Sequence, residues 1–150
     1  MVAKSDAQLA QAAIEWVKGH QKELVHKLAG RYGSASRIPL SIFMAGSPGA
    51  GKTEFSKNFI QQFENHEKYI VRIDPDEIRE MLPQHTPGKA HLFQTAVGIG
   101  VEKVHDHALR TKKSFLLDGT FARFDKAHDN VRRSVGCILT PQYGRQSGSR

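Results

Sequence analysis

Apolar and polar residues alternate with a helical period in the first part of the chain. Between Ser5 and Ala29, apolar side chains recur at spacings of three, four and seven residues. These side chains are Leu9, Ala13, Trp16, Val17, Leu24 and Leu28. Ser5 or Asp6 can cap the start of the segment, and Gly30 stands where a left-handed helix end belongs. The pattern predicts one amphipathic helix, which either packs against the domain or forms an arm that binds a partner.

After Pro39 the pattern changes to short apolar runs that alternate with helical segments. The first run ends in a glycine-rich turn, as expected of a buried parallel strand. The predicted strands are residues 40–45, 69–73 and 114–117, with residues 135–140 as a candidate fourth strand. The predicted helices are residues 51–63, 76–81 and 91–109. Alternating strands and helices predict an α/β fold in which helices flank a parallel sheet.

Length and composition exclude several classes of protein. The 150 residues fit one domain, and 39% hydrophobic with 25% charged residues is ordinary for a soluble globular protein. No apolar run approaches the roughly 20 residues that span a bilayer, which excludes a transmembrane protein. The N-terminus lacks the apolar core of a signal peptide, and the single Cys137 cannot form an internal disulfide. We therefore expect a cytoplasmic protein.

The charge balance indicates the kind of partner. With 22 basic and 15 acidic residues, the chain has a formal net charge of +7. A basic protein favours anionic partners, such as nucleotides, phosphorylated small molecules or nucleic acid. The charge alone does not choose among these partners.

The most specific motif is a glycine-rich loop between the first predicted strand and the next helix. The segment Gly46-Ser47-Pro48-Gly49-Ala50-Gly51-Lys52-Thr53 matches G-x-x-x-x-G-K-[ST] in full. Glycines let successive backbone N–H groups converge on a phosphate, and the helix N-terminus adds its positive dipole. Lys52 can reach the β- and γ-phosphates, and the Thr53 hydroxyl can bind Mg²⁺. The sequence therefore predicts a site for a nucleoside triphosphate with Mg²⁺.

Two acidic segments follow predicted strands. Asp74 fits a helix N-cap, and Glu77 fits the second position of a capping box. Asp76 is not needed for the cap, and it lies where ligands bind in α/β sheets, so it is a candidate general base. Asp118, in Asp118-Gly119-Thr120, ends an apolar strand in the manner of the acid that helps to hold Mg²⁺ in P-loop proteins.

The predicted helix between these acids has two unusual features. Gly98 and Gly100 each cost about 1 kcal/mol in a helix relative to alanine, and either close packing or room for a ligand would explain them. His105 and His107 fall on different faces of the helix, so they do not predict a zinc site. A later basic run is either a solvated face or a contact to phosphates; it comprises Arg123, Lys126, Arg132 and Arg133.

Together the motifs resemble the zeta toxin family of P-loop kinases. The resemblance rests on the glycine-rich loop, on Asp74-Pro75-Asp76 and on Asp118-Gly119-Thr120. Glu102 precedes Asp118 at a spacing similar to that of a substrate-binding acid in that family. We expect three parts in the chain: an N-terminal helix and linker (1–38), a kinase domain (39–135) and a tail that matches the family poorly (136–150).

The resemblance implies a function and a set of roles. Zeta toxins use ATP or GTP to phosphorylate a hydroxyl of UDP-N-acetylhexosamines. By the resemblance, Lys52 stabilises the transferring phosphoryl group and Asp76 is the catalytic base. Glu102, Asp118 and Thr120 contact the sugar nucleotide, although Asp118 can serve Mg²⁺ instead. An antitoxin protein is the implied partner, and we do not expect a membrane or nucleic-acid partner.

The sequence departs from the family after Arg133. Family members continue with further strands and a lid whose arginines bind the triphosphate, whereas this chain does not follow that pattern. Two alternatives therefore stay open. One is another small-molecule or polynucleotide P-loop kinase, and the other is a nucleotide-binding fragment with impaired transfer.

Overall fold

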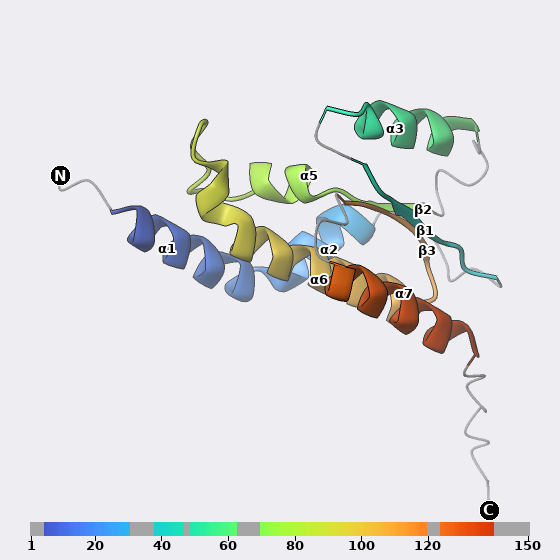
Figure 1. Ribbon diagram of the computed structural model, residues 1–150. Helices are drawn as coiled ribbons and strands as arrows, with labels where there is room; N and C mark the ends of the chain where they lie inside the picture. Colours follow the sequence, from blue (N-terminus) through green and yellow to red (C-terminus); the bar gives the residue numbers. More distant parts are fainter. Residues whose placement is uncertain (1–4, 31–37, 47–48, 63–69, 120–123, 140–150) are drawn as a thin grey trace, which may run out of the picture.

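A three-stranded parallel sheet, in the order β1-β3-β2, lies at the centre of the computed structural model (Figure 1). The structure describes residues 5–30, 38–46, 49–62, 70–119 and 124–139. The strands are β1 (Ser41–Met44), β2 (Ile70–Ile73) and β3 (Ser114–Asp118). The predicted α/β fold with a parallel sheet is confirmed.

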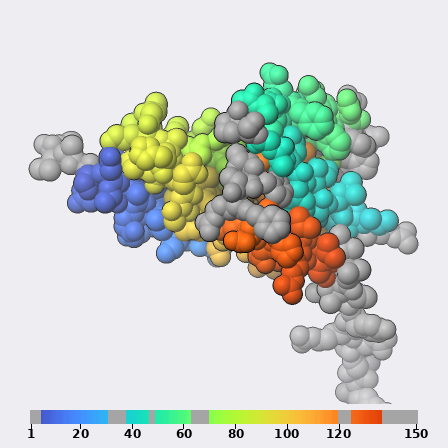
Figure 2. Space-filling view, in the orientation of Figure 1, coloured from blue at the N-terminus to red at the C-terminus, as the bar shows by residue number. Residues whose placement is uncertain are grey.

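Helices cover both faces of the sheet. Helix α3 (Lys52–Gln62) lies on one face, and α2 and α6 lie on the other, with α1 packed against α6 (Figure 1). The remaining bounds are α1 (Asp6–Gly19), α2 (Gln21–Ala29), α5 (Pro75–Glu80), η1 (Ala90–Phe93), α6 (Gln94–Arg110) and α7 (Phe124–Leu139). Figure 2 shows α1, in blue, at one end of the molecule, with α3, in teal, toward the other.

Successive residues of β3 face opposite helix layers. Phe115 and Leu117 pack in the main core with α1, α2 and α6, whereas Leu116 packs with Ile60 of α3. A strand that is covered on both faces has no polar side, and the predicted strands are therefore mainly apolar. Arg72, a charged residue within β2, is described below.

The strand register brings the ends of the three strands to one edge of the sheet. Met44 of β1 pairs with Asp118 of β3, and Ile73 of β2 pairs with Leu117. The segments that follow β1 and β2 therefore leave the sheet beside the carboxyl end of β3. This edge is where ligands bind in open α/β sheets.

The predicted N-terminal helix is two helices rather than one. Ser5 caps α1 as expected, through a reciprocal capping box with Gln8. The chain then leaves helical geometry at His20, whose φ is −112° and ψ is 24°. The His20 ring stacks on Trp16 and donates from Nδ1 to the Trp16 carbonyl at 2.8 Å, a carbonyl that also accepts from the backbone N–H of His20. Within the described residues, no helix has the length and apolar character needed to cross a bilayer.

The expected left-handed end at Gly30 is wrong. Gly30 has right-handed backbone, with φ −71° and ψ −24°. The ammonium of Lys113, at the start of β3, donates to the Ala29 carbonyl at 2.8 Å. Because a distant side chain satisfies this carbonyl, the helix end needs no reversal of the backbone.

The candidate fourth strand is also wrong. Residues 135–139 form the last part of α7, and residue 140 lies outside the described residues. The apolar run from Val135 is short, and a run of that length fits a strand or one face of a helix equally well. Of the preceding basic run, Lys126, Arg132 and Arg133 belong to the same helix, where Arg133 pairs with Asp106 of α6, and Arg123 lies outside the described residues.

Helix packing explains one of the two glycines within α6. A Cβ at Gly100 would lie 2.8 Å from Cγ2 of Ile78, a buried residue of α5, so Gly100 permits close packing of α5 on α6. A Cβ at Gly98 would meet nothing within 4 Å. Close packing is therefore the reason for Gly100 alone.

Candidate active site

The glycine-rich loop turns through conformations that favour glycine. Gly49 and Gly51 have φ values of +80° and +72°, in the left-handed region. At Gly46, a Cβ would come within 3.1 Å of Cδ of Lys52, so the loop backbone lies close to the lysine stem. The Lys52 ammonium donates to the Gly46 carbonyl at 2.8 Å. The first residue of the motif, Gly46, therefore lies against the side chain of Lys52.

The remaining residues of the motif lie at the start of α3. Lys52 is the first helical residue, and the exposed Thr53 follows it in the first turn. Ala50 is exposed as well. Ser47 and Pro48 lie outside the described residues, so their predicted role in binding the nucleotide stays a prediction.

Asp74 caps α5 as the sequence predicts. Its Oδ1 accepts from the backbone N–H of Asp76 at 2.8 Å, and the residue is buried at the end of β2. The predicted capping box is wrong, because the Glu77 carboxylate accepts from Arg72 instead. Burial raises the pKa of Glu77, and the neighbouring Arg72 guanidinium opposes the rise.

Arg72 connects the acids at the strand ends. Its Nη2 lies 2.5 Å from Oδ2 of Asp74 and 3.4 Å from Oδ2 of Asp118. Asp118 is buried, and burial raises the pKa of its carboxyl. The Asp74 carboxylate raises it further, while the cations of Arg72 and Lys52 lower it. These opposing effects place a carboxylate with a raised pKa next to the glycine-rich loop.

Asp76 differs from the buried acids because its side chain is 69% exposed. One carboxylate oxygen accepts from Nη1 of Arg79, one turn later in α5. Arg79 is mostly buried, and its Nε has no hydrogen-bond partner among the described residues. Asp76 is thus held at the start of α5 with its carboxylate toward solvent.

These elements enclose one cleft of about 620 Å³. The described residues that line it are Gly49, Gly51, Lys52, Thr53, Glu54, Asp74, Pro75, Asp76, Arg79, Gln94, Asp118 and Gly119. The cleft brings together the predicted phosphate-binding residues Gly49, Gly51, Lys52 and Thr53, the candidate base Asp76 and the strand-end acid Asp118. Arg79 and Gln94 are lining residues that the sequence did not single out.

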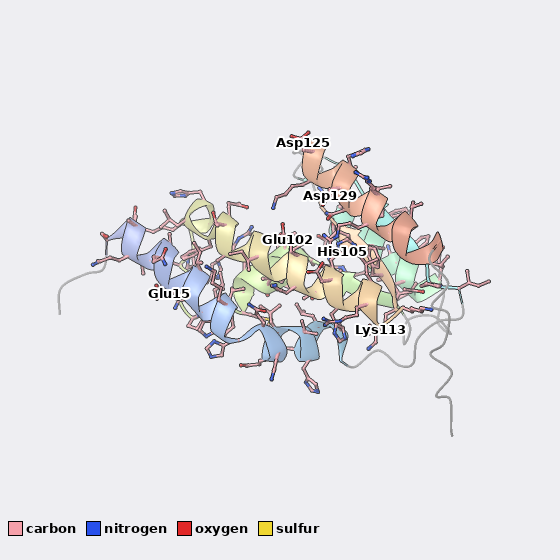
Figure 3. All side chains as sticks on the ribbon, turned by 90° about the horizontal axis from the view of Figure 1, so that it is seen from below. Glu15, Glu102, His105, Lys113, Asp125 and Asp129 are labelled. Carbon is pink, nitrogen blue, oxygen red and sulfur yellow. The ribbon has the colours of Figure 1, made fainter. Side chains whose placement is uncertain are left out.

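Glu102, a predicted substrate contact, does not line this cleft. Glu102 lies on α6 and pairs with Lys126 of α7 at 2.7 Å, and Figure 3 shows it between these two helices. Thr120 lies outside the described residues. Of the two predicted sugar-nucleotide contacts that the structure describes, Asp118 lines the cleft and Glu102 does not.

His105 lies close to Glu102 on α6 but is fully buried (Figure 3). Its ring makes an edge contact with Phe115 at 4.8 Å between ring centroids. Neither ring nitrogen has a hydrogen-bond partner among the described residues. Burial, with a smaller effect of Arg133, lowers the pKa of His105 to about 4. The histidine is therefore a neutral part of the core near neutral pH.

Comparisons with known proteins agree with this arrangement. A solved structure from the PezAT chromosomal toxin–antitoxin system of the human pathogen Streptococcus pneumoniae is similar in fold, with a TM-score of 0.70 and 21% sequence identity. The similarity covers 83% of this chain and 52% of that one, so the chain spans about half the length of its structural neighbour. No curated protein matches the chain. The sequence model of the zeta toxin family matches residues 26–134. The chain therefore belongs to the zeta toxin family.

Proposed function

We propose that the chain is an ATP- or GTP-dependent phosphotransferase that phosphorylates a hydroxyl of a UDP-N-acetylhexosamine. The observation that carries this proposal is the shared cleft of Lys52, Asp76 and Asp118. A cation in a glycine-rich loop, a buried acid and an exposed acid at one sheet edge are the parts that phosphoryl transfer needs. Membership of the zeta toxin family supports the choice of acceptor.

The described residues fit the phosphates of a nucleotide. The left-handed glycines turn the loop at the start of α3, where backbone N–H groups and the helix dipole favour an anion. Lys52, now on the Gly46 carbonyl, can exchange that neutral acceptor for a charged phosphate oxygen. The loop and Lys52 thus bind the triphosphate and stabilise the charge on its γ-phosphoryl group.

The described residues also fit Mg²⁺, which prefers oxygen ligands. The Thr53 hydroxyl and the Asp118 carboxylate line the same cleft and would hold the ion, directly or through water. Bound there, the ion would neutralise charge on the β- and γ-phosphates. Thr53 and Asp118 would fix the position of the ion relative to Lys52.

Asp76 is the proposed general base. Its carboxylate takes the proton of the acceptor hydroxyl while the hydroxyl oxygen forms its bond to the γ-phosphorus. The bond between that phosphorus and the β,γ-bridging oxygen breaks, and the nucleoside diphosphate leaves. Because Asp76 is exposed at the rim of the cleft, it is accessible to an acceptor. Arg79, which donates to Asp76, orients the carboxylate.

The remaining roles are carried over from the family. Asp118 can contact the sugar nucleotide as well as the ion, and Thr120 is a second predicted contact. Glu102 would have to leave Lys126 to reach a substrate. An antitoxin that covers the nucleotide site is the proposed protein partner, and the origin of the structural neighbour in a toxin–antitoxin system supports it.

Transfer of labelled γ-phosphate from ATP to UDP-N-acetylglucosamine tests the proposal, with Asp76→Asn as the matched control. We expect transfer by the wild type, at least 100-fold slower transfer by the variant, and nearly equal ATP affinity in both. Transfer to other acceptors but not to UDP-N-acetylglucosamine would show a different small-molecule or polynucleotide kinase. If Asp76→Asn also loses ATP binding and structure, Asp76 is a structural residue.

A second candidate function is nucleotide binding without transfer. The ion pair of Asp76 with Arg79 favours it, because the proposed base is already occupied by a cation. ATP binding in a titration, together with no transfer to a panel of acceptors, would identify this function. Transfer to any acceptor would exclude it.

A further inference from the structure

Arg72 is a charged residue within a buried parallel strand. Its neighbours in β2, Val71 and Ile73, are fully buried, and Arg72 itself is 9% exposed. A guanidinium keeps its charge in any protein environment, so burial is tolerated only where its donors are paired. The contacts of Arg72 therefore show which groups pair with its buried charge.

The guanidinium joins four elements of the fold. Its Nε donates to Oγ of Ser56 in α3 at 3.0 Å. Its Nη1 donates to Glu77 of α5, and its Nη2 contacts both Asp74 at the end of β2 and Asp118 at the end of β3. All three nitrogens are thus used, each in a different direction.

The contact with α3 continues to the phosphate-binding turn. The Ser56 hydroxyl, which accepts from Arg72, donates to the Thr53 carbonyl at 2.8 Å. Ser56 is fully buried, so water does not compete for these bonds. A continuous set of hydrogen bonds therefore links the strand-end acids to the first turn of α3.

We propose that Arg72 is a positioning residue for phosphoryl transfer. It fixes the carboxylates of Asp74 and Asp118 and holds the first turn of α3 in register with them. Arg72 does not line the cleft and acts only through the residues that do. This inference rests on the proposed function. The position of the first turn of α3 matters for phosphoryl transfer because it places Lys52 and Thr53 opposite Asp118.

The choice of arginine follows from the geometry. A guanidinium is a rigid planar fork with five donors, whereas a lysine ammonium is a single point of charge on a flexible stem. Lysine at position 72 can neutralise one carboxylate but cannot hold Ser56, Glu77 and Asp118 at once. Arg72→Lys therefore keeps the positive charge but removes most of the hydrogen bonds that position the neighbouring groups. Arg72→Met would leave three carboxylates without their shared partner, and we expect it to fold poorly.

The first test compares Arg72→Lys with Arg133→Lys. Arg133 also pairs with a carboxylate, Asp106, but it lies between α6 and α7 outside the cleft. We expect Arg72→Lys to keep the wild-type circular dichroism spectrum. Its kcat falls at least tenfold at an almost unchanged KM for ATP, because misplaced reacting groups cost rate more than ground-state binding. Arg133→Lys keeps both constants within about twofold.

The second test is a binding measurement. With a fluorescent ATP analogue, Arg72→Lys should need about tenfold more Mg²⁺ for half-maximal binding, since residues that orient metal ligands commonly change metal affinity 10- to 100-fold. Binding without Mg²⁺ should stay near the wild-type level. A wild-type kcat together with wild-type Mg²⁺ dependence in a folded Arg72→Lys protein overturns the inference.

The third test does not depend on catalysis. Amide hydrogen exchange of the protein without added nucleotide should become faster in Arg72→Lys, both in the first turn of α3 and at the start of α5. Faster exchange confined to β2 and α5 would show a local structural role and overturn the inference. If the wild type transfers no phosphate, the proposed function fails, and the exchange measurement alone decides whether Arg72 sets the register.

Discussion

We predict that nucleotide binding depends most on Lys52. Lys52→Ala should weaken ATP binding by about 10- to 100-fold, because a charge-assisted hydrogen bond contributes about 1.5–3 kcal/mol. Transfer should fall further, since the same cation stabilises the transferring phosphoryl group. Isothermal titration with ATP and the transfer assay give the two values.

The matched control for Lys52 is Lys57→Ala, an exposed lysine of the same helix. It removes the same charge from α3 without touching the glycine-rich loop. ATP affinity that is equal in the two variants would contradict the role of Lys52.

His105 is expected to make stability depend on pH. Its pKa is about 4 in the folded protein and near 6.5 when exposed, so the unfolded chain binds the proton first as the pH falls. The contribution of neutral His105 to the free energy of unfolding is fully present above pH 6.5. It is lost between pH 6.5 and 4, by up to about 3 kcal/mol. His105→Phe keeps an aromatic ring against Phe115 and should remove this dependence.

Urea unfolding at pH 7, 5.5 and 4.5 measures the effect, with the exposed His91→Gln as the control. The raised pKa values of Glu77 and Asp118 act in the opposite direction, because these carboxyls bind protons more readily in the folded protein. The difference between His105→Phe and wild type isolates the histidine. Equal pH dependence in both proteins would show that His105 is protonated without cost.

Single functional residues could be predicted where the residues that act together are close in the sequence. Lys52 and Thr53 were found because the whole motif lies within eight residues of the chain. Asp74 was found because a helix cap is a local pattern, and Asp76 because it follows a predicted strand, where ligands bind in α/β sheets. Arg72 was missed, since its partners come from other elements. The signal was present, however, because a charged residue between apolar neighbours in a buried strand needs a partner.

At the scale of elements, the two glycines of α6 offer a matched pair. Gly100→Ala should lower the free energy of unfolding by about 1–3 kcal/mol, because the new methyl group overlaps Ile78 of α5. Gly98→Ala should raise it by up to about 1 kcal/mol, since alanine favours the helix and nothing opposes its Cβ. Chemical denaturation of both variants gives the values. Equal effects would mean that α5 moves freely on α6.

The helices and strands were predictable where the local periodicity of apolar residues distinguishes one from the other. The strands and the helix after the loop follow from apolar runs and a glycine-rich turn. The break at His20 was missed because the apolar spacing continues across it, although Gly19, a residue type common at helix ends, is the last residue of α1. The end of α7 was assigned to a strand because its apolar run is too short for a period to be read.

At the scale of the molecule, the N-terminal helices and the predicted kinase domain share one core. Ala13 and Val17 of α1 and Leu24 of α2 are buried in the same cluster as Phe93 of η1 and Phe115 of β3. The sequence placed residues 1–38 apart from the domain, because the family motifs all follow Pro39. The shared core favours a single cooperative unit instead, since removing α1 and α2 would expose the apolar side of α6.

Unfolding can test whether the chain behaves as this single unit. Trp16 is the one tryptophan of the chain and lies in α1, so its fluorescence reports the N-terminal helices, whereas far-ultraviolet circular dichroism reports all helices. We expect the two signals to share one denaturation midpoint. Leu24→Ala should move both together, at a cost of about 2–5 kcal/mol, while Val131→Ala at a partly exposed site of α7 should cost much less. If Leu24→Ala shifts only the fluorescence transition, the N-terminal helices fold as a separate unit, and the glycine-rich loop and its cleft do not depend on them.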